Sequence, residues 1–74
     1  MKTTIKLFAS LREGRFDSRS CELADGATVQ DALDSLEISA AEAAILFLNG
    51  RHTQPEQGLT EGDSLAVFPP VGGG

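Results

Sequence analysis

The stretch with the clearest chemical potential is the final seven residues, Phe68-Pro69-Pro70-Val71-Gly72-Gly73-Gly74. Glycine has no Cβ atom, so a glycine tail can enter a channel that admits no side chain and can adopt any φ that the channel requires. The carboxylate of Gly74 could then attack ATP and give an acyl-adenylate. Because the two prolines keep the arm extended, less entropy is lost on insertion. We therefore interpret Gly74 as the reacting position and residues 69–74 as the tail that delivers it.

Other kinds of site have little support in the sequence. It contains no Ser/His/Asp or Cys/His set, no P-loop and no glycine-rich turn opening a helix, and its carboxylates are scattered. The single histidine, His52, has no Cys, Asp or Glu at metal-ligand spacing, so we expect no metal site. The single cysteine, Cys21, is expected to face the core. The sequence thus predicts a chain that enzymes act on, and not an enzyme.

Length and composition indicate one small globular domain. A chain of 74 residues with 41% hydrophobic and 23% charged residues buries only about 60% of the surface of its unfolded form. The net charge of −5 and the absence of Trp and Tyr argue against nucleic-acid binding, which needs clustered Lys and Arg. No apolar run approaches the roughly 18 residues of a membrane span, and no signal peptide precedes the first strand. With a single Cys, we expect a cytoplasmic protein.

Alternating polar and apolar residues predict two strands in the first third of the chain. Residues 2–9 place Ile5 and Leu7 on one face and Phe8 on the other. Residues 16–23 form the second expected strand. Phe8 is the exception on a face that otherwise looks solvent-exposed. A neighbouring strand or loop could cover it, or it could belong to an apolar docking patch, and the strand alone leaves both explanations open.

The strongest helical pattern follows at residues 28–37. Thr28 is the expected N-cap, with Asp31 at position N3. Val29 and Leu33 begin an apolar stripe at helical spacing, so one side of the helix should pack inward. Ser39 is a candidate cap for a further short turn.

Three strands are expected after the helix, at residues 45–48, 51–53 and 64–68. The first is an uninterrupted apolar run, which is typical of a strand buried on both faces near the centre of a sheet. Asn49-Gly50 is a strong hairpin signal. Leu59 is the one apolar anchor in the polar segment before the last strand. That strand should turn Phe68 away from the face that Leu65 and Val67 share.

The order β-β-α-β-β-β outlines an α+β fold of the β-grasp, or ubiquitin-like, type. A mixed sheet would carry one main helix across one face. The first and last strands would lie parallel at its centre, since the helix region supplies the long crossover that parallel neighbours need. Residues 1–68 would form this domain and residues 69–74 the tail. Phe8 and Phe68 would then sit side by side, facing away from the helix, and we interpret them as a docking patch.

The chain resembles the MoaD/ThiS family of small ubiquitin-like sulfur carriers over essentially its whole length. The similarity rests on Leu7-Phe8-Ala9-Ser10-Leu11-Arg12-Glu13, on Leu59-Thr60-Glu61-Gly62-Asp63, and on the ending from Phe68 to Gly74. That ending looks like Phe-Pro-Pro-Val-x-Gly-Gly, with Gly72 as x. The Leu-Phe-Ala and Phe-Pro-Pro pieces are more similar to MoaD, the small subunit of molybdopterin synthase, than to ThiS of thiazole synthesis.

The resemblance implies a mechanism and a set of partners. An adenylyltransferase related to ubiquitin-activating enzymes would adenylate Gly74 with ATP, and a sulfur donor would convert the adenylate into a thiocarboxylate. The tail would then give up its sulfur in an acceptor synthase, the large subunit of molybdopterin synthase in the MoaD-like case. The chain itself would bind no cofactor.

Other outcomes stay open at this point. The carrier could serve thiamine thiazole or cysteine synthesis. It could also be a ubiquitin-like modifier joined through Gly74 to lysines of other proteins, or a module that docks through Phe8 and Phe68 with a chemically idle tail.

The resemblance also implies which residues meet a partner. They are Phe8, Arg12, His52, Leu59 and Phe68. His52 stands where a MoaD-like chain would have an apolar contact residue. The tail residues that lead to Gly74 are Pro69, Pro70, Val71, Gly72 and Gly73.

Overall fold

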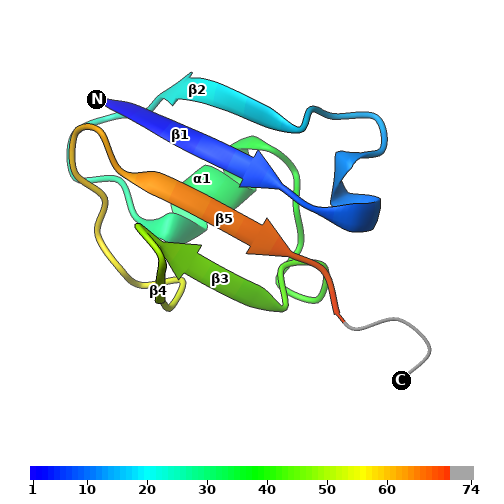
Figure 1. Cartoon of the computed structure of the whole chain (residues 1–74). Coiled ribbons are helices and arrows are strands. Elements are labelled where there is room, and N and C mark those ends of the chain that lie inside the picture. Colours follow the sequence, from blue (N-terminus) through cyan, green and yellow to red (C-terminus); the bar gives the residue numbers. More distant parts are fainter. Residues whose placement is uncertain (71–74) are drawn as a thin grey trace.

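The computed structural model describes residues 1–70, which form a five-stranded mixed sheet with one α-helix across one face (Figure 1). The elements are β1 (Lys2–Leu7), the 3-10 helix η1 (Ala9–Arg12), β2 (Ser18–Glu22), α1 (Val29–Ser35), β3 (Ile45–Leu48), β4 (Arg51–His52) and β5 (Ser64–Phe68). This order confirms the expected β-grasp fold. Within residues 1–70, no helix is long and apolar enough to cross a membrane.

The parallel pair β1 and β5 lies at the centre of the sheet, as predicted. The strand order is β2-β1-β5-β3-β4, and the register sets Ile5 against Leu65 and Leu7 against Val67. All four side chains are buried and face α1. The core between sheet and helix is made of Ile5, Leu7, Leu11, Val29, Ala32, Leu33, Ile38, Ala43, Leu46, Leu59, Leu65 and Val67.

Helix α1 begins at a capping box. The backbone N–H of Asp31 donates to Thr28 Oγ1 at 3.2 Å, and the Thr28 N–H donates to Asp31 Oδ2 at 2.9 Å. Two backbone donors that the first turn leaves unpaired are thereby satisfied. The helix ends at Ser35, earlier than the predicted residue 37. Glu37 has a φ of 57°, in the left-handed region, so the chain leaves the helical path there.

Strand β3 differs from the sequence prediction. It is the fourth strand of the sheet and only Leu46 is buried, whereas Ile45, Phe47 and Leu48 are half-exposed. Its outer neighbour β4 has only two residues, and α1 covers one face only. The apolar run therefore does not mark a strand enclosed on both sides. Its outward residues instead form open apolar surface.

A polar network fixes the β3–β4 hairpin to the start of β5. Asn49 and Gly50 both have positive φ, 52° and 82°, which is the two-residue turn that the sequence predicts. The Asn49 amide donates to Asp63 Oδ1 at 2.9 Å, and the N–H of Thr60 donates to Asp63 Oδ2 at 2.8 Å. Hydrogen bonds from Asn49 and then Thr60 hold the pKa of Asp63 below its ordinary value, against a smaller opposing effect of burial.

We expect Asp63→Asn to lower the free energy of unfolding by about 1–3 kcal/mol near neutral pH, because it weakens two hydrogen bonds to a buried carboxylate. A carboxylate whose pKa is lowered by folding stabilises the protein above its unfolded pKa, and loses that contribution as the pH falls through the folded value. The difference between variant and parent should therefore shrink below about pH 4.

Urea unfolding followed by circular dichroism at about pH 7 and about pH 3 measures this effect. Glu56→Gln, at an exposed position, is the control. A stability difference that stays the same at both pH values would contradict the role assigned to the Asp63 carboxylate.

Candidate functional site

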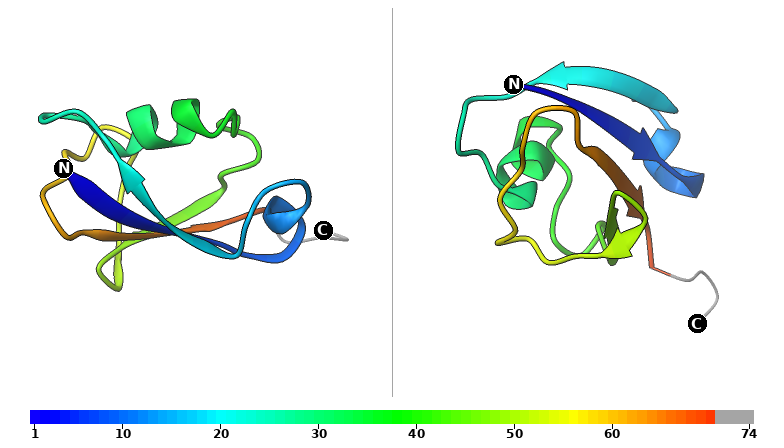
Figure 2. Two further views of the ribbon diagram at one scale, coloured as in Figure 1. Left: turned by 90° about the horizontal axis from the view of Figure 1, so that it is seen from above. Right: turned by 60° about the vertical axis from the view of Figure 1, so that its left-hand side comes forward.

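The face of the sheet opposite α1 carries a cluster of half-exposed aromatic side chains. Figure 2 shows α1 on one side of the sheet only. The register pairs Ile45 with Phe68 and Phe47 with Ala66, so these four residues share the open face. In this antiparallel pairing the apolar side chains of β3 extend the surface that Phe68 begins.

Four rings form a continuous row across this face. The rings of Phe8 and Phe68 stack with centroids 4.2 Å apart and planes 10° apart. Phe47 meets Phe68 edge to face at 5.8 Å and 86°. His52 meets Phe47 in the same way at 5.9 Å and 88°. We call Phe8, Phe68, Phe47 and His52 the aromatic row. It runs from the end of β1 through β5 and β3 to β4.

Arg12 lies at the Phe8 end of the aromatic row. Its guanidinium carbon is 5.6 Å from the Phe8 ring centroid, within the range of a cation–π contact. Its Nε donates to the carbonyl of Leu7 at 3.0 Å and lies 3.5 Å from Asp17 Oδ1. Arg12 therefore flanks the aromatic row at its Phe8 end, and His52 forms the other end of the row.

Local backbone geometry places Phe8 and Arg12 together. Phe8 is extended, with φ −125° and ψ 152°, and its N–H donates to the carbonyl of Val67 at 3.2 Å. Ala9 then adopts a φ of 52° and turns the chain into η1. Because Leu11 of η1 is buried, the short helix is anchored with Arg12 turned back over Phe8.

The structure brings together four of the five predicted partner-binding residues: Phe8, Arg12, His52 and Phe68. Leu59 is the exception, and its assignment is corrected. Its side chain is 5% exposed and belongs to the core, and its N–H donates to the carbonyl of Ala27 at 2.9 Å. As the one apolar residue of a polar segment, Leu59 fills the space under that segment and is not available to a partner.

The tail begins directly after the aromatic row. Pro69 is half-exposed and Pro70 is exposed. The remaining tail positions, Val71, Gly72, Gly73 and Gly74, lie outside the described residues, so their predicted roles stay predictions. The described part therefore fixes where the tail starts, next to Phe68.

Phe47 is a site residue that the sequence reasoning missed. It lies inside an apolar run without alternation, so the run itself does not show to which face of the sheet its side chain points. The hairpin turn after this run indicates the orientation of Phe47. A two-residue Asn49-Gly50 turn sets Phe47 opposite His52, and residues opposite each other share a face.

Cys21 and the carboxylates of the described residues do not gather into a metal site. Within residues 1–70 no group of three or more His, Cys, Asp or Glu could hold a metal ion. Cys21 is half-buried on β2 and packs against the core, in agreement with its expected orientation. Burial raises the pKa of its thiol above the ordinary value, although the charge of Arg19 opposes this effect.

Comparison with known proteins places this geometry in a family. Residues 5–74 match the model of the ThiS family. The structure of SAMP1 from Haloferax volcanii is similar, with a TM-score of 0.78 and 32% identity over 100% of both chains. So is a Pyrococcus furiosus protein assigned as molybdopterin converting factor subunit 1, with a TM-score of 0.78 and 29% identity over 96% of this chain and 99% of that one.

A third structure holds subunits 1 and 2 of the molybdopterin-converting factor of Helicobacter pylori. The matched chain has a TM-score of 0.66 and 18% identity over 100% of both chains, which shows a shared fold. A search of curated proteins found no match.

The chain belongs to the ThiS family of β-grasp proteins. It is a sulfur carrier of the ThiS/MoaD kind or a modifier of the SAMP kind. Members of the family are non-catalytic carrier proteins, which confirms the predicted resemblance and the prediction that the chain is not itself an enzyme.

The stacked geometry predicts a measurable coupling between Phe8 and Phe68. In a double-mutant cycle with Phe8→Leu and Phe68→Leu, we expect an interaction free energy of about 0.5–1.5 kcal/mol, the range for aromatic pairs beyond their area burial. Urea unfolding gives the four free energies. As a control, Phe68→Leu combined with Val29→Ala, in α1 on the other side of the sheet, should be additive. Additivity in the Phe8/Phe68 cycle itself would show that the stack contributes nothing specific.

Proposed function

We propose that this chain carries sulfur as a thiocarboxylate on Gly74 and donates it in molybdopterin synthesis. The observation that carries the proposal is the continuity between docking surface and tail. The aromatic row includes Phe68, and the next residue is Pro69. A partner that holds the row therefore holds the root of the tail, so the positions beyond Pro70 can be delivered into the same partner. The likeness to the Pyrococcus furiosus converting-factor subunit supports the choice of pathway.

The proposed chemistry takes place in three steps in partner active sites. A carboxylate oxygen of Gly74 attacks the α-phosphorus of ATP, and pyrophosphate leaves. A persulfide of a donor then attacks the acyl carbon and AMP leaves, giving an acyl disulfide. A thiol of the donor cleaves the S–S bond, which leaves the donor as a disulfide and Gly74 as a thiocarboxylate. In the acceptor, the thiocarboxylate sulfur attacks an electrophilic carbon of the substrate, as thiolates do. Water then cleaves the acyl–sulfur bond, which returns Gly74 as a carboxylate and leaves the sulfur on the product.

The chain's own part in these steps is to dock and to present its tail. ATP would be bound by the activating enzyme, and the chain would hold no cofactor of its own. A location in the cytoplasm, where ATP is available and a single cysteine stays reduced, fits this assignment.

Two partner proteins follow from the mechanism. One is an adenylyltransferase related to ubiquitin-activating enzymes, and the other is an acceptor synthase. The Helicobacter pylori structure holds subunit 1 of its converting factor with subunit 2, and we propose a comparable large-subunit partner for this chain. The aromatic row suits such docking because aromatic side chains are enriched among the residues that dominate interface energies.

A second candidate function is covalent modification of other proteins. It is favoured by the 32% identity to the Haloferax volcanii small archaeal modifier protein 1, over 95% of this chain in a second structure of that protein. In this case a lysine amine of a target would attack the Gly74 adenylate, AMP would leave, and an isopeptide bond would form.

We expect the Gly74 carboxylate to gain sulfur when the chain is incubated with its activating enzyme, ATP and a sulfur donor. Intact-protein mass spectrometry should show one oxygen replaced by sulfur, located on Gly74 by fragmentation. Deletion of Gly74 should abolish the gain and leave the circular dichroism unchanged. Ladders of covalent conjugates without any thiocarboxylate would instead establish the modifier function, and sulfur gain in the truncated chain would refute Gly74 as the reacting position.

The aromatic row should control activation. We expect Phe47→Ala to lower kcat/KM for thiocarboxylate formation at least about tenfold, or roughly 1.4 kcal/mol, because a docking ring near the row's centre is lost. Phe16→Ala is the matched control, since Phe16 is the one phenylalanine outside the row and packs under Arg19. Equal effects of the two substitutions would rule out docking through the row.

A further inference from the structure

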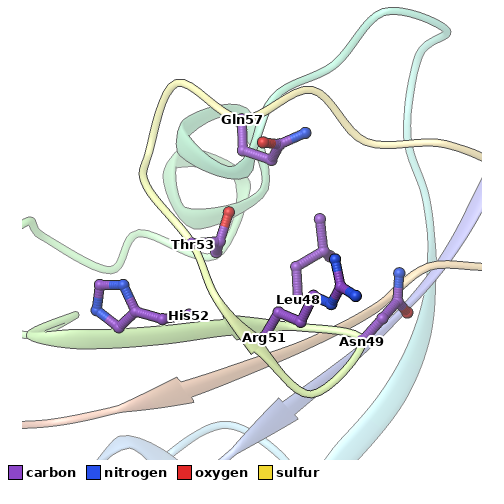
Figure 3. A pocket seen from close by; sticks show the side chains of 6 residues that line it. All are labelled: Leu48, Asn49, Arg51, His52, Thr53 and Gln57. Carbon is purple, nitrogen blue, oxygen red and sulfur yellow. The ribbon is translucent and has the colours of Figure 1, made fainter.

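An open pocket of about 530 Å³ lies beside the β3–β4 hairpin. It is lined by Leu48, Asn49, Arg51, His52, Thr53 and Gln57 (Figure 3). In Figure 3 the side chains of Leu48 and Arg51 point together toward the segment that carries Gln57, while the His52 ring points away. The register agrees, because Arg51 pairs with Leu48.

Most of this pocket lies on the opposite side of the sheet from the aromatic row. Leu48 pairs with the buried Leu65 and packs against the core, so its face is the one that α1 covers. Phe47, one position along β3, faces the other way and belongs to the row. His52 contacts Phe47 and also lines the pocket, so it lies at the border of the two surfaces. A partner seated on Phe8, Phe68 and Phe47 leaves the side of the pocket that Leu48 and Arg51 form open.

Arg51 is the arginine without a fixed partner among the described residues. The other three are engaged: Arg12 lies 3.5 Å from Asp17, Arg15 lies 3.9 Å from Glu42, and Arg19 stacks on Phe16 at 4.3 Å. No carboxylate within residues 1–70 lies within 4.0 Å of the Arg51 guanidinium, and no hydrogen bond holds it. As far as residues 1–70 show, the Arg51 guanidinium is thus unpaired in a pocket, although the net charge of the chain is −5.

Asp63, the acidic residue of the neighbouring network, forms no ion pair with Arg51 within residues 1–70. The carboxylate of Asp63 accepts hydrogen bonds from Asn49 and Thr60 at 2.8–3.1 Å. The same network holds the hairpin in place. The pocket is also anchored at Thr53, whose N–H donates to the carbonyl of Leu46 at 2.9 Å. The backbone that carries Arg51 is therefore held in place, and its guanidinium can interact with a bound group.

We propose that this pocket binds an acidic side chain of a partner protein, next to an aliphatic side chain of the same segment. The planar guanidinium of Arg51 suits a carboxylate, which it can contact through two N–H groups. Leu48 is half-exposed and supplies an apolar contact for the neighbouring residue. The side-chain amide nitrogen of Gln57 is engaged with the carbonyl of Gly58 at 3.1 Å, which leaves its oxygen for a backbone N–H.

The open form of the pocket favours a peptide over a free metabolite. Small-molecule sites bury most of the ligand's surface, whereas four of the residues that line this pocket, Asn49, Arg51, His52 and Gln57, are themselves exposed. A side chain that is already attached to a docked protein needs less enclosure, because much of its entropy has been lost in docking. This inference does not depend on the sulfur chemistry proposed above. Under this inference, the chain can bind one protein through the aromatic row and, at the same time, a second protein through the pocket.

Titration of the full ¹⁵N-labelled chain with the capped dipeptide acetyl-Leu-Glu-amide, at about 0.15 M salt, tests the inference. Because this free dipeptide lacks the advantage of prior docking, we expect weak but saturable shifts of backbone amides, at concentrations on the order of millimolar, confined to residues 48–57. Acetyl-Leu-Gln-amide, which has the same shape without the charge, should bind about two- to fivefold more weakly, the upper part of the range for one exposed ion pair. Arg51→Gln should remove this preference for Glu, and Arg19→Gln, at an arginine outside the pocket, should keep it.

Three results would overturn the inference. One is equal binding of the two dipeptides to the parent chain. Another is an unchanged preference for Glu in Arg51→Gln, with its folded spectrum intact. The third is saturation by acetate alone at the concentration that saturates the dipeptide, which would assign the pocket to small anions and not to a protein segment.

Discussion

The parallel pairing of β1 with β5 is the constraint on which the rest of the structure depends. On its inner side it sets Ile5 and Leu7 against Leu65 and Val67 and so forms the centre of the core. At its end it brings Phe8 and Phe68 into contact from opposite ends of the sequence. The contacts that stabilise the fold and the surface proposed for docking thus come from the same two strands, on their two faces.

Much of this arrangement could be predicted from the sequence, because it follows from short-range rules. Alternation assigned Phe8 and Phe68 to one face, and the long crossover made their strands parallel neighbours. Phe47 was missed because an unbroken apolar run does not show which of its side chains point to which face of the sheet. Leu59 was assigned wrongly because a match to the family motif identifies the residue but does not show whether its side chain is buried. The pocket around Arg51 depends on how a polar segment without regular structure folds over the hairpin, and no local pattern encodes that.

The short β3–β4 hairpin contributes side chains to both faces of the sheet. Strand β4 has two residues, and its alternation sends His52 to the aromatic row and Arg51 to the pocket. The left-handed turn at Asn49 and Gly50 fixes this assignment, and the hydrogen bonds between Asn49 and Asp63 hold it against β5. A slip of one residue in the register would exchange the two side chains between the faces, so a single turn determines what each surface presents.

The position of Cys21 bears on the proposed chemistry. An acyl-adenylate reacts with an accessible thiolate, and Cys21 is the only cysteine in the sequence. Its side chain is half-buried on β2 and packs against the core, and burial raises the pKa of its thiol. If Gly74 is activated as we propose, the packing and the raised pKa both disfavour acylation of the chain at its own cysteine.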